Sequence, residues 1–197
     1  AGIYSELGDT KKQLALTEVL YEKGLMSTSS NVVNLANLYL LHGLPYKAAS
    51  VLEKEMNAGV VEANDRNLRL ISQAWYQARE DEKAIPPLER AAAMTNDGEL
   101  YVRLAQANLN LEHWAEAAAA VQKALQLGGL KRNDTANIML GMALFNQKQL
   151  EQARRAFERA ASDSRSQRAA TQWIAYVDSE MRSREVMAQD LPEVQSK

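Results

Sequence analysis

Alanine recurs in this chain at nearly constant intervals. Ala48, Ala84, Ala117 and Ala153 are separated by 36, 33 and 36 residues, and each has the same kinds of neighbours. A small residue lies twelve positions before each alanine, and a larger apolar residue lies four positions after it. The small residues are Ala36, Ser72, Ala105 and Gly141, and the larger ones are Leu52, Leu88, Val121 and Phe157. A period of about 34 residues with two fixed small positions predicts antiparallel helix pairs that touch most closely where side chains are smallest.

The repeat defines four units, at about residues 29–62, 65–97, 98–131 and 134–167. In each unit, apolar residues recur at helical spacing in two stretches separated by a short break. Residues 1–28 are predicted to be a partial N-terminal helix pair, and 168–188 a helix that caps the fourth unit. Residues 189–197 are predicted to be a disordered tail. The sequence therefore predicts an all-α array of stacked helix pairs.

Two local features qualify this prediction. Pro86 and Pro87 lie inside the second helix of the second unit, and each removes a hydrogen bond to the carbonyl four residues earlier. We therefore expect this helix to begin irregularly. In the fourth unit, Asn133 or Asp134 is expected to be the N-cap of the first helix.

The units resemble the tetratricopeptide repeat, or TPR, a helix-turn-helix motif. Its first helix carries a Leu-Gly or Leu-Ala pair followed three residues later by an aromatic residue. The pairs at 35–36 and 71–72 precede Tyr39 and Trp75 in this way, whereas the third and fourth units have Asn108 and Leu144 at the aromatic position. The proline that often ends the motif is missing from all four units. The resemblance implies a TPR solenoid, a right-handed superhelix whose first helices line a concave groove.

Two stretches carry a narrower resemblance. Residues 84–92 read Ala-Ile-Pro-Pro-Leu-Glu-Arg-Ala-Ala, and residues 172–180 read Gln-Trp-Ile-Ala-Tyr-Val-Asp-Ser-Glu. Both are similar to segments of bacterial TPR proteins associated with TonB-type energy-transducing systems. This resemblance implies a periplasmic protein that is an accessory component of TonB-dependent transport. Without it, the cytoplasm is the expected location.

Composition disfavours several classes of function. The chain has 23 basic and 25 acidic residues, so no overall positive field attracts nucleic acid or an anionic membrane surface. Cysteine is absent, and no apolar run is long enough to cross a bilayer. His42 and His113 have no further metal ligands at suitable spacing, and no phosphate-binding loop or nucleophile elbow is present. We therefore expect a chain that is not an enzyme, holds no metal or cofactor, binds no nucleic acid and inserts into no membrane.

The candidate binding residues lie on the first helices of the units, which the TPR resemblance places along the groove. The position after each small residue holds Asn37, Gln73, Gln106 and Met142. Asparagine and glutamine offer both donors and an acceptor, so a row of them can pair with the main chain of an extended peptide. A polar, solvated face explains the same row equally well. The full set of predicted contact residues is Asn37, Arg66, Arg69, Gln73, Gln77, Arg103, Gln106, Met139 and Met142.

The leading hypothesis is a non-catalytic scaffold that binds a protein or peptide segment in its groove. The arginines at 66, 69 and 103 favour an acidic or backbone-rich segment. A rival hypothesis is self-association, in which the C-terminal helix with Trp173 and Tyr176 docks on another copy, and the sequence leaves the oligomeric state open. RNA binding by helical repeats is the third hypothesis, and the balanced charge disfavours it.

Overall fold

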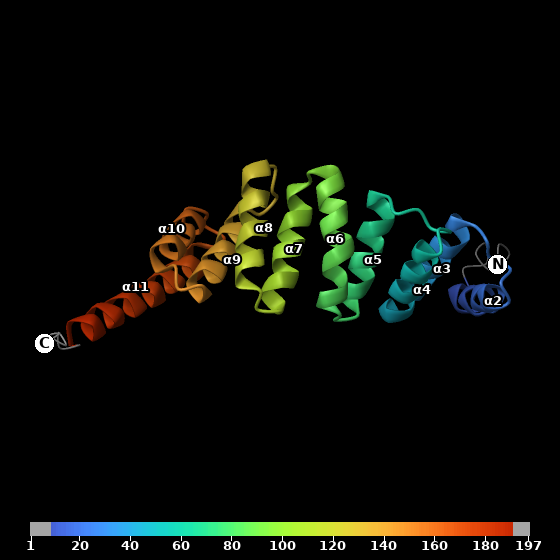
Figure 1. Ribbon diagram of the computed structural model, residues 1–197, viewed down its shortest axis with the longest axis horizontal. Coiled ribbons are helices and arrows are strands. Elements are labelled where there is room, and N and C mark those ends of the chain that lie inside the picture. Colours follow the sequence, from blue (N-terminus) through green and yellow to red (C-terminus); the bar gives the residue numbers. More distant parts are fainter. Residues whose placement is uncertain (1–8, 191–197) are drawn as a thin grey trace, which may run out of the picture. The chain divides into compact units, whose positions relative to one another are not determined.

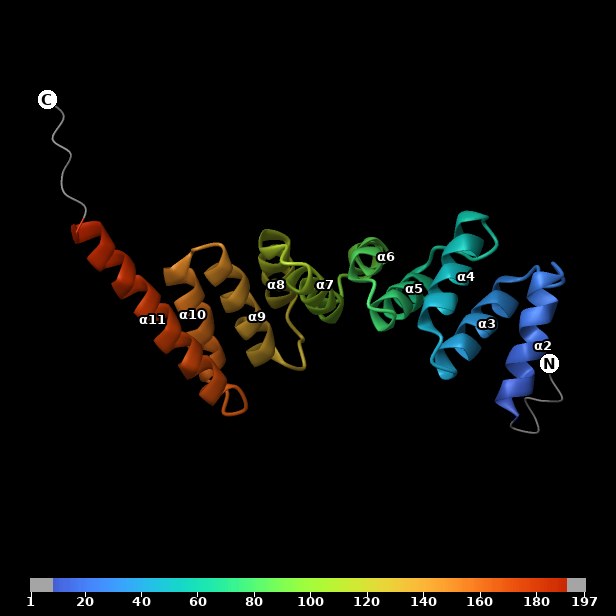
Figure 2. The same cartoon turned by 90° about the horizontal axis from the view of Figure 1, so that it is seen from below.

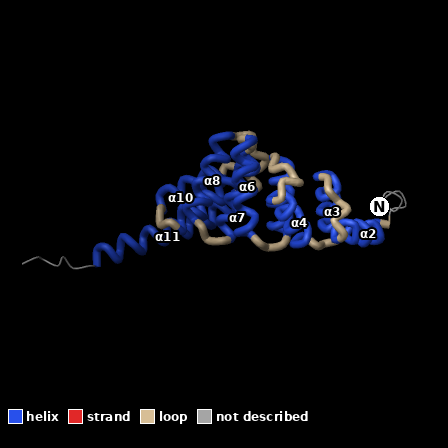
Figure 3. The backbone as a smooth tube through the Cα atoms, turned by 45° about the vertical axis from the view of Figure 1, so that its right-hand side comes forward, coloured by secondary structure: helices blue, strands red, loops and turns tan. Residues whose placement is uncertain are grey.

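The computed structural model describes residues 9–190, with side chains up to residue 188. The predictions for residues 1–8 and for most of the tail, residues 191–197, lie outside the described residues. Within residues 9–190 all regular structure is helical, and short loops join the helices (Figure 3). The chain forms two compact units, residues 1–96 and 97–197.

The first unit contains α2 to α6 in chain order (Figure 1). Consecutive helices pack against one another, with α3 on α4 and α5 on α6 as helix pairs, while α2 lies against α3. The bounds are α2 Thr10–Glu22, α3 Ser29–Leu41, α4 Pro45–Asn57, α5 Asp65–Gln77 and α6 Asp81–Thr95.

The second unit contains two further pairs, α7 with α8 and α9 with α10, and a long last helix, α11, that packs along α10 (Figure 2). The bounds are α7 Gly98–Asn110, α8 Trp114–Leu127, α9 Asn133–Asn146, α10 Leu150–Ala161 and α11 Gln167–Asp190. The predicted fold class, an all-α protein of consecutively paired helices, is confirmed.

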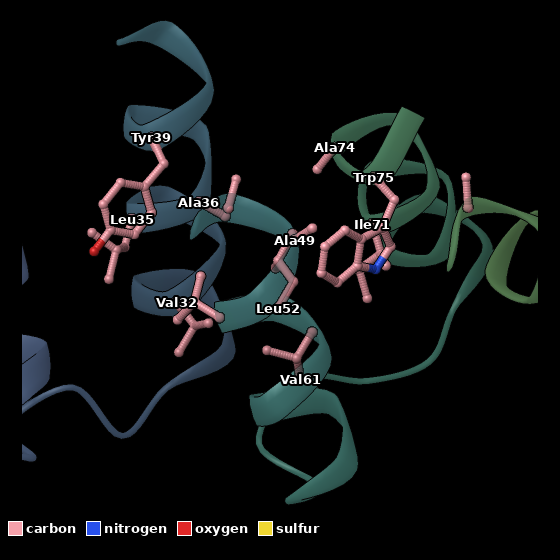
Figure 4. Packing of buried hydrophobic residues seen from close by; sticks show 13 residues of the cluster. Val32, Leu35, Ala36, Tyr39, Ala49, Leu52, Val61, Ile71, Ala74 and Trp75 are labelled. Atoms are coloured by element: carbon pink, nitrogen blue, oxygen red, sulfur yellow. The ribbon is translucent and has the colours of Figure 1, made fainter. Parts of the chain in front are cut away.

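The recurring residues of the sequence are the contact points of these pairs. All twelve of them are buried, namely Ala36, Ala48, Leu52, Ser72, Ala84, Leu88, Ala105, Ala117, Val121, Gly141, Ala153 and Phe157. In the first unit, Ile71 and Trp75 of α5 face Ala49 and Leu52 of α4 (Figure 4). The small residues allow close approach of the helix backbones, and the large apolar residues fill the remaining space.

The turn inside each helix pair repeats one backbone conformation. The second residue after the first helix is left-handed in all four pairs, with φ between 60° and 70° at Gly43, Arg79, Glu112 and Lys148. Each of these residues and its successor donate amide hydrogen bonds back to the end of the helix, at 3.1 and 2.8 Å after α3. This is the Schellman arrangement, in which glycine is the favoured residue. Three of the four turns therefore hold a side chain in a strained conformation.

The two prolines do not interrupt α6. The helix is continuous from Asp81 and contains both of them. The expected irregular start is absent. The missing amides would have bonded to the carbonyls of Glu82 and Lys83, which lie in the first turn. Because both residues are exposed, water can bond to these carbonyls, and the helix continues.

Asp134 holds the start of the fourth pair to the loop before α11. Arg132 donates to both carboxylate oxygens, from Nε to Oδ1 at 2.9 Å and from Nη2 to Oδ2 at 2.7 Å, and the hydroxyl of Ser166 donates to Oδ2 at 2.6 Å. The hydrogen bonds from Arg132 hold the pKa of the buried Asp134 carboxyl well below its usual range, against the opposing effect of burial. The expectation of Asn133 or Asp134 as N-cap is wrong, because α9 begins at Asn133 and Arg132 is its N-cap.

Candidate functional site

The predicted contact residues of the second helix pair form one stripe along α5. Arg66, Arg69, Gln73 and Gln77 are spaced by three, four and four residues, so they share one side of the helix. Arg66, Gln73 and Gln77 are exposed and Arg69 is half-buried, whereas the opposite side of the helix is buried through residues such as Trp75. The stripe therefore offers two cationic and two amide groups to a partner.

The positive charge of this stripe is partly offset by an acidic neighbour. Arg69 Nε lies 3.6 Å from Asp65 Oδ2, one turn earlier on α5, and the Arg69 side chain is 33% exposed. Arg66 is exposed at the start of the same helix. On α5, the predicted positive charge therefore rests mainly on Arg66.

The equivalent stripe on α3 is less polar. The residues 36 positions before those of α5 are Ser30, Val33, Asn37 and Leu41. Asn37 is exposed as the sequence predicts, and Leu41, which the sequence reasoning missed, is 65% exposed. The sequence could have indicated Leu41 as a contact residue, because it follows Asn37 by four residues, as the predicted contact Gln77 follows Gln73.

In the second unit, α7 continues the same register. Gln106 is half-buried and donates from Nε2 to Oδ1 of Asn110, four residues later, at 2.9 Å. Arg103 is exposed on the flank of this stripe. Asn110 is a further amide that the sequence reasoning missed, and its position matches that of Gln77.

On α9 the two predicted methionines differ. Met142 is half-buried at the position equivalent to Gln106, and Asn146 lies four residues later. Met139 is only 5% exposed, so it is a core residue and the expectation that it contacts a partner is wrong. The reason is that α9 packs against α7, α8 and α10, which leaves little of its surface open.

The stripes place exposed or half-buried amides at matching positions on α3, α5 and α7: Asn37, Gln73, Gln77, Gln106 and Asn110. They are held on helices, so their backbone positions are fixed. Such groups can pair with peptide N–H and C=O groups, and they supply no nucleophile, proton shuttle or redox centre.

The rest of the described chain adds no reactive group to these stripes. Within residues 9–190 no cluster of three potential metal ligands occurs. In the same part of the chain no helix has both the length and the apolar content to span a bilayer.

No protein-family model and no curated protein sequence matches the chain. Solved structures do match. A crystal structure of MamA protein has a TM-score of 0.65 at 19% identity, covering 85% of this chain and 90% of that one. MamA from Desulfovibrio magneticus RS-1 has a TM-score of 0.65 at 15% identity, covering 82% and 89%. YrrB, described as a TPR protein with an unusual peptide-binding site, has a TM-score of 0.65 at 19% identity, covering 87% and 86%. At these identities the matches show that the chain has a TPR-type fold.

Proposed function

We propose that this protein is a non-catalytic interaction scaffold that binds an extended segment of a partner protein at the amide stripes of α3 and α5 in its first unit. The observation that carries the proposal is the recurrence of amides at one register position, with Asn37, Gln73 and Gln106 each directly following a buried small residue. The fold requires the small residue to be buried. It makes no demand on the next residue, so three amides at that position favour a common use.

The chemistry of the stripes suits a main-chain ligand. Each amide supplies a donor and an acceptor, so the stripes of α3 and α5 can bond to peptide groups at separate points of the segment, with little demand on the partner's side chains. Arg66 adds a cation for an acidic residue of the segment, and the exposed Leu41 adds an apolar contact. YrrB, with the same type of fold and a peptide-binding site, supports this use by analogy.

A peptide selected from a random library against this protein provides the test. Its affinity for the protein is measured by fluorescence anisotropy with the unchanged chain and with Gln73→Ala combined with Gln77→Ala. We expect the double variant to bind at least about tenfold more weakly, since two sets of hydrogen bonds are lost.

Glu89→Ala, an exposed change on α6, is the matched control and should leave the affinity unchanged. Circular dichroism confirms that each variant keeps its helical content. Equal affinity of the unchanged and double-variant proteins would show that α5 is not part of the peptide site.

We further propose a periplasmic location and an accessory role in TonB-dependent transport. The proposal rests on the resemblance of residues 84–92 and 172–180 to TPR proteins of TonB-type systems. Fractionation of the bacterium that produces the protein tests it directly. Recovery of the protein in the cytoplasmic fraction, with a periplasmic marker protein released intact, would rule the proposal out.

Self-association through α11 is the second candidate function. Trp173 stacks on Phe157 at a centroid distance of 5.2 Å, so its ring is used within the chain. Tyr176, Val186 and Met187 nevertheless remain 56% to 68% exposed on this helix. Sedimentation over a range of protein concentrations separates the candidates, because a persistent monomer leaves no role for α11 in self-association.

A further inference from the structure

A cleft whose chemistry differs from that of the amide stripes lies on another side of α3. Tyr39 comes two residues after Asn37, and two helical residues correspond to a rotation of about 200°. Tyr39 therefore points away from the amide stripe and into a cleft of about 360 Å³ between α2 and α4. Three tyrosines line this cleft, Tyr21 from α2, Tyr39 from α3 and Tyr46 from α4.

Carboxylates hold two of these tyrosines from one side. Tyr39 donates its hydroxyl to Glu18 Oε1 at 3.0 Å, and Tyr21 donates to Glu55 Oε1 at 2.7 Å. Burial and the neighbouring carboxylates raise the pKa of both tyrosines, so the hydroxyls stay protonated and keep donating. The two hydroxyl groups are thereby held in place, and the cleft is lined by two glutamates, Glu18 and Glu22, beside two lysines, Lys47 and Lys54.

The ring faces already attract cations of the same chain. Lys47 Nζ lies 5.5 Å from the centroid of the Tyr39 ring, and Lys54 Nζ lies 5.1 Å from that of Tyr21. Lys47 also donates to Glu18 Oε1 at 2.7 Å. The two lysine side chains are 56% and 72% exposed, so each can swing into solvent without opening the fold.

We propose that this cleft binds an arginine side chain of a partner protein, whose guanidinium replaces the Lys47 ammonium. Tyr39 is only 5% exposed while Lys47 is in place, so an incoming guanidinium can reach only the part of the ring that the Lys47 ammonium now covers. A guanidinium is planar, so once Lys47 has swung away it stacks there while donating two parallel hydrogen bonds to the Glu18 carboxylate. Lysine is a point charge and cannot form both contacts in the same way. Tyr39 and Lys47 both donate to Oε1 of a carboxylate that is 29% exposed, which leaves it open to approach from the cleft.

The cleft is independent of the amide stripes. Its lining residues come from α2, α3 and α4, and none of them is a predicted contact of the peptide segment. A partner that uses both surfaces would need an arginine outside the extended segment. A change in the cleft should therefore leave peptide binding to α5 unchanged.

Nuclear magnetic resonance of the whole chain with isotope-labelled tyrosine tests this site. The probe is a blocked Gly-Arg-Gly peptide, and the matched peptides carry lysine or the neutral isostere citrulline in place of arginine. We expect the arginine peptide to shift the Tyr21 and Tyr39 ring resonances saturably and the citrulline peptide to leave them unchanged. The lysine peptide should bind several-fold more weakly.

Two variants make the result decisive. Lys47→Ser removes the competing cation, so the affinity for the arginine peptide should rise about threefold or more. Glu18→Gln removes the carboxylate charge, so this affinity should fall at least about fivefold. Lys11→Ser, an exposed change on α2 outside the cleft, should have no effect.

Three results would each overturn the proposal. They are equal binding of the citrulline peptide, an unchanged affinity after Lys47→Ser, and the absence of ring shifts with the arginine peptide. If Glu18→Gln detaches α2, the Lys47→Ser comparison still decides the question, because it leaves Glu18 and both tyrosines in place.

Discussion

Adding one methyl group to Gly141 should destabilise the second unit, and its neighbours set the size of the loss. A Cβ atom at this position would lie 2.5, 2.6 and 2.7 Å from Cε1, Cζ and Cδ1 of Phe157. Carbon atoms in van der Waals contact are about 3.5 to 4.0 Å apart, so the ring would have to move by about 1 Å. Phe157 is fully buried, and its ring is stacked on that of Trp173 in α11. Movement of the ring would therefore disturb its stacking on α11.

Two opposing terms fix the expected magnitude of Gly141→Ala. Overpacking of a close-packed core costs about 1 to 3 kcal/mol. Replacing glycine by alanine inside a helix stabilises it by about 1 kcal/mol. Because all three contacts with the ring would be shorter than 3.0 Å, we place the clash in the upper part of its range, about 2 to 3 kcal/mol. The net loss in the free energy of unfolding is then about 1 to 2 kcal/mol. For a chain of this size each kcal/mol lowers Tm by about 2 to 4 °C.

The first unit suggests the compensating change. There the small position holds Ala36, and the large position holds Leu52 instead of phenylalanine. Combining Gly141→Ala with Phe157→Leu should therefore be less damaging than the sum of the two single changes, by about 1 kcal/mol.

Urea unfolding followed by tryptophan fluorescence measures this coupling, because Trp173 lies against Phe157. Circular dichroism at the same urea concentrations shows whether the repeats unfold in one transition. Gly141→Ala at or above the stability of the unchanged chain would refute the packing argument, and so would simple additivity of the two changes.

Three further predictions concern the turns, the buried carboxylate and the helix register. Lys148→Gly should stabilise the chain by about 0.5 to 1 kcal/mol, because it removes a side chain from a residue in the left-handed conformation. Gly43→Ala should destabilise the chain by about 1 kcal/mol. The added Cβ atom would have no other atom within 4 Å, so this loss comes from backbone strain alone. Urea unfolding measures both changes. A loss of stability in Lys148→Gly, or a gain in Gly43→Ala, would contradict the argument from the left-handed turns.

Asp134→Asn should cost about 1.5 to 3 kcal/mol at neutral pH. Because the folded-state pKa of Asp134 lies below its unfolded value, its stabilisation is complete above about pH 4 and is lost as the pH falls through the folded pKa. The difference between the variant and the unchanged chain should therefore shrink in acid, which melting curves at a series of pH values would show. Finally, Ala117→Leu should destabilise the chain by about 1 to 3 kcal/mol, because it overpacks a buried position. Ala115→Leu, at an exposed position, should be tolerated. Equal melting temperatures of these two variants would contradict the predicted helix register.

The packing positions were predictable because the fold repeats them. A close helix contact needs a small residue at the same place in every unit, so Ala48, Ala84, Ala117 and Ala153 stand out from one sequence. The same logic fails at α2, where the only buried described residue is Thr17. Thr17 lies four residues before Tyr21, as Ala48 lies four before Leu52, but its distance of 31 residues from Ala48 departs from the period. Among the described residues α2 packs mainly against α3, so fewer contacts constrain its sequence, and the repeat pattern does not predict its register.

The candidate site was predictable only in part, for a different physical reason. The position after each small residue is solvent-facing on α3 and α5, and helical geometry alone indicates that. Whether a flanking position is open depends on how many helices pack around its own helix. Arg103 and Met139 hold equivalent positions, yet Arg103 is exposed and Met139 is buried, because α9 is enclosed by three neighbours. Such enclosure is a tertiary property that spacing within one helix does not encode.

The two proposed binding surfaces lie on different sides of one short helix, α3. Its buried residues, such as Leu35 and Ala36, fix its position against α4. Asn37 then presents an amide to one side, and Tyr39 presents a hydrogen-bonded ring to the other. Because the buried residues are shared, a core substitution such as Ala36→Leu should impair peptide binding and arginine binding together. A substitution at Asn37 should impair only peptide binding, and Lys47→Ser should improve only arginine binding. This difference distinguishes a loss of fold from a loss of function.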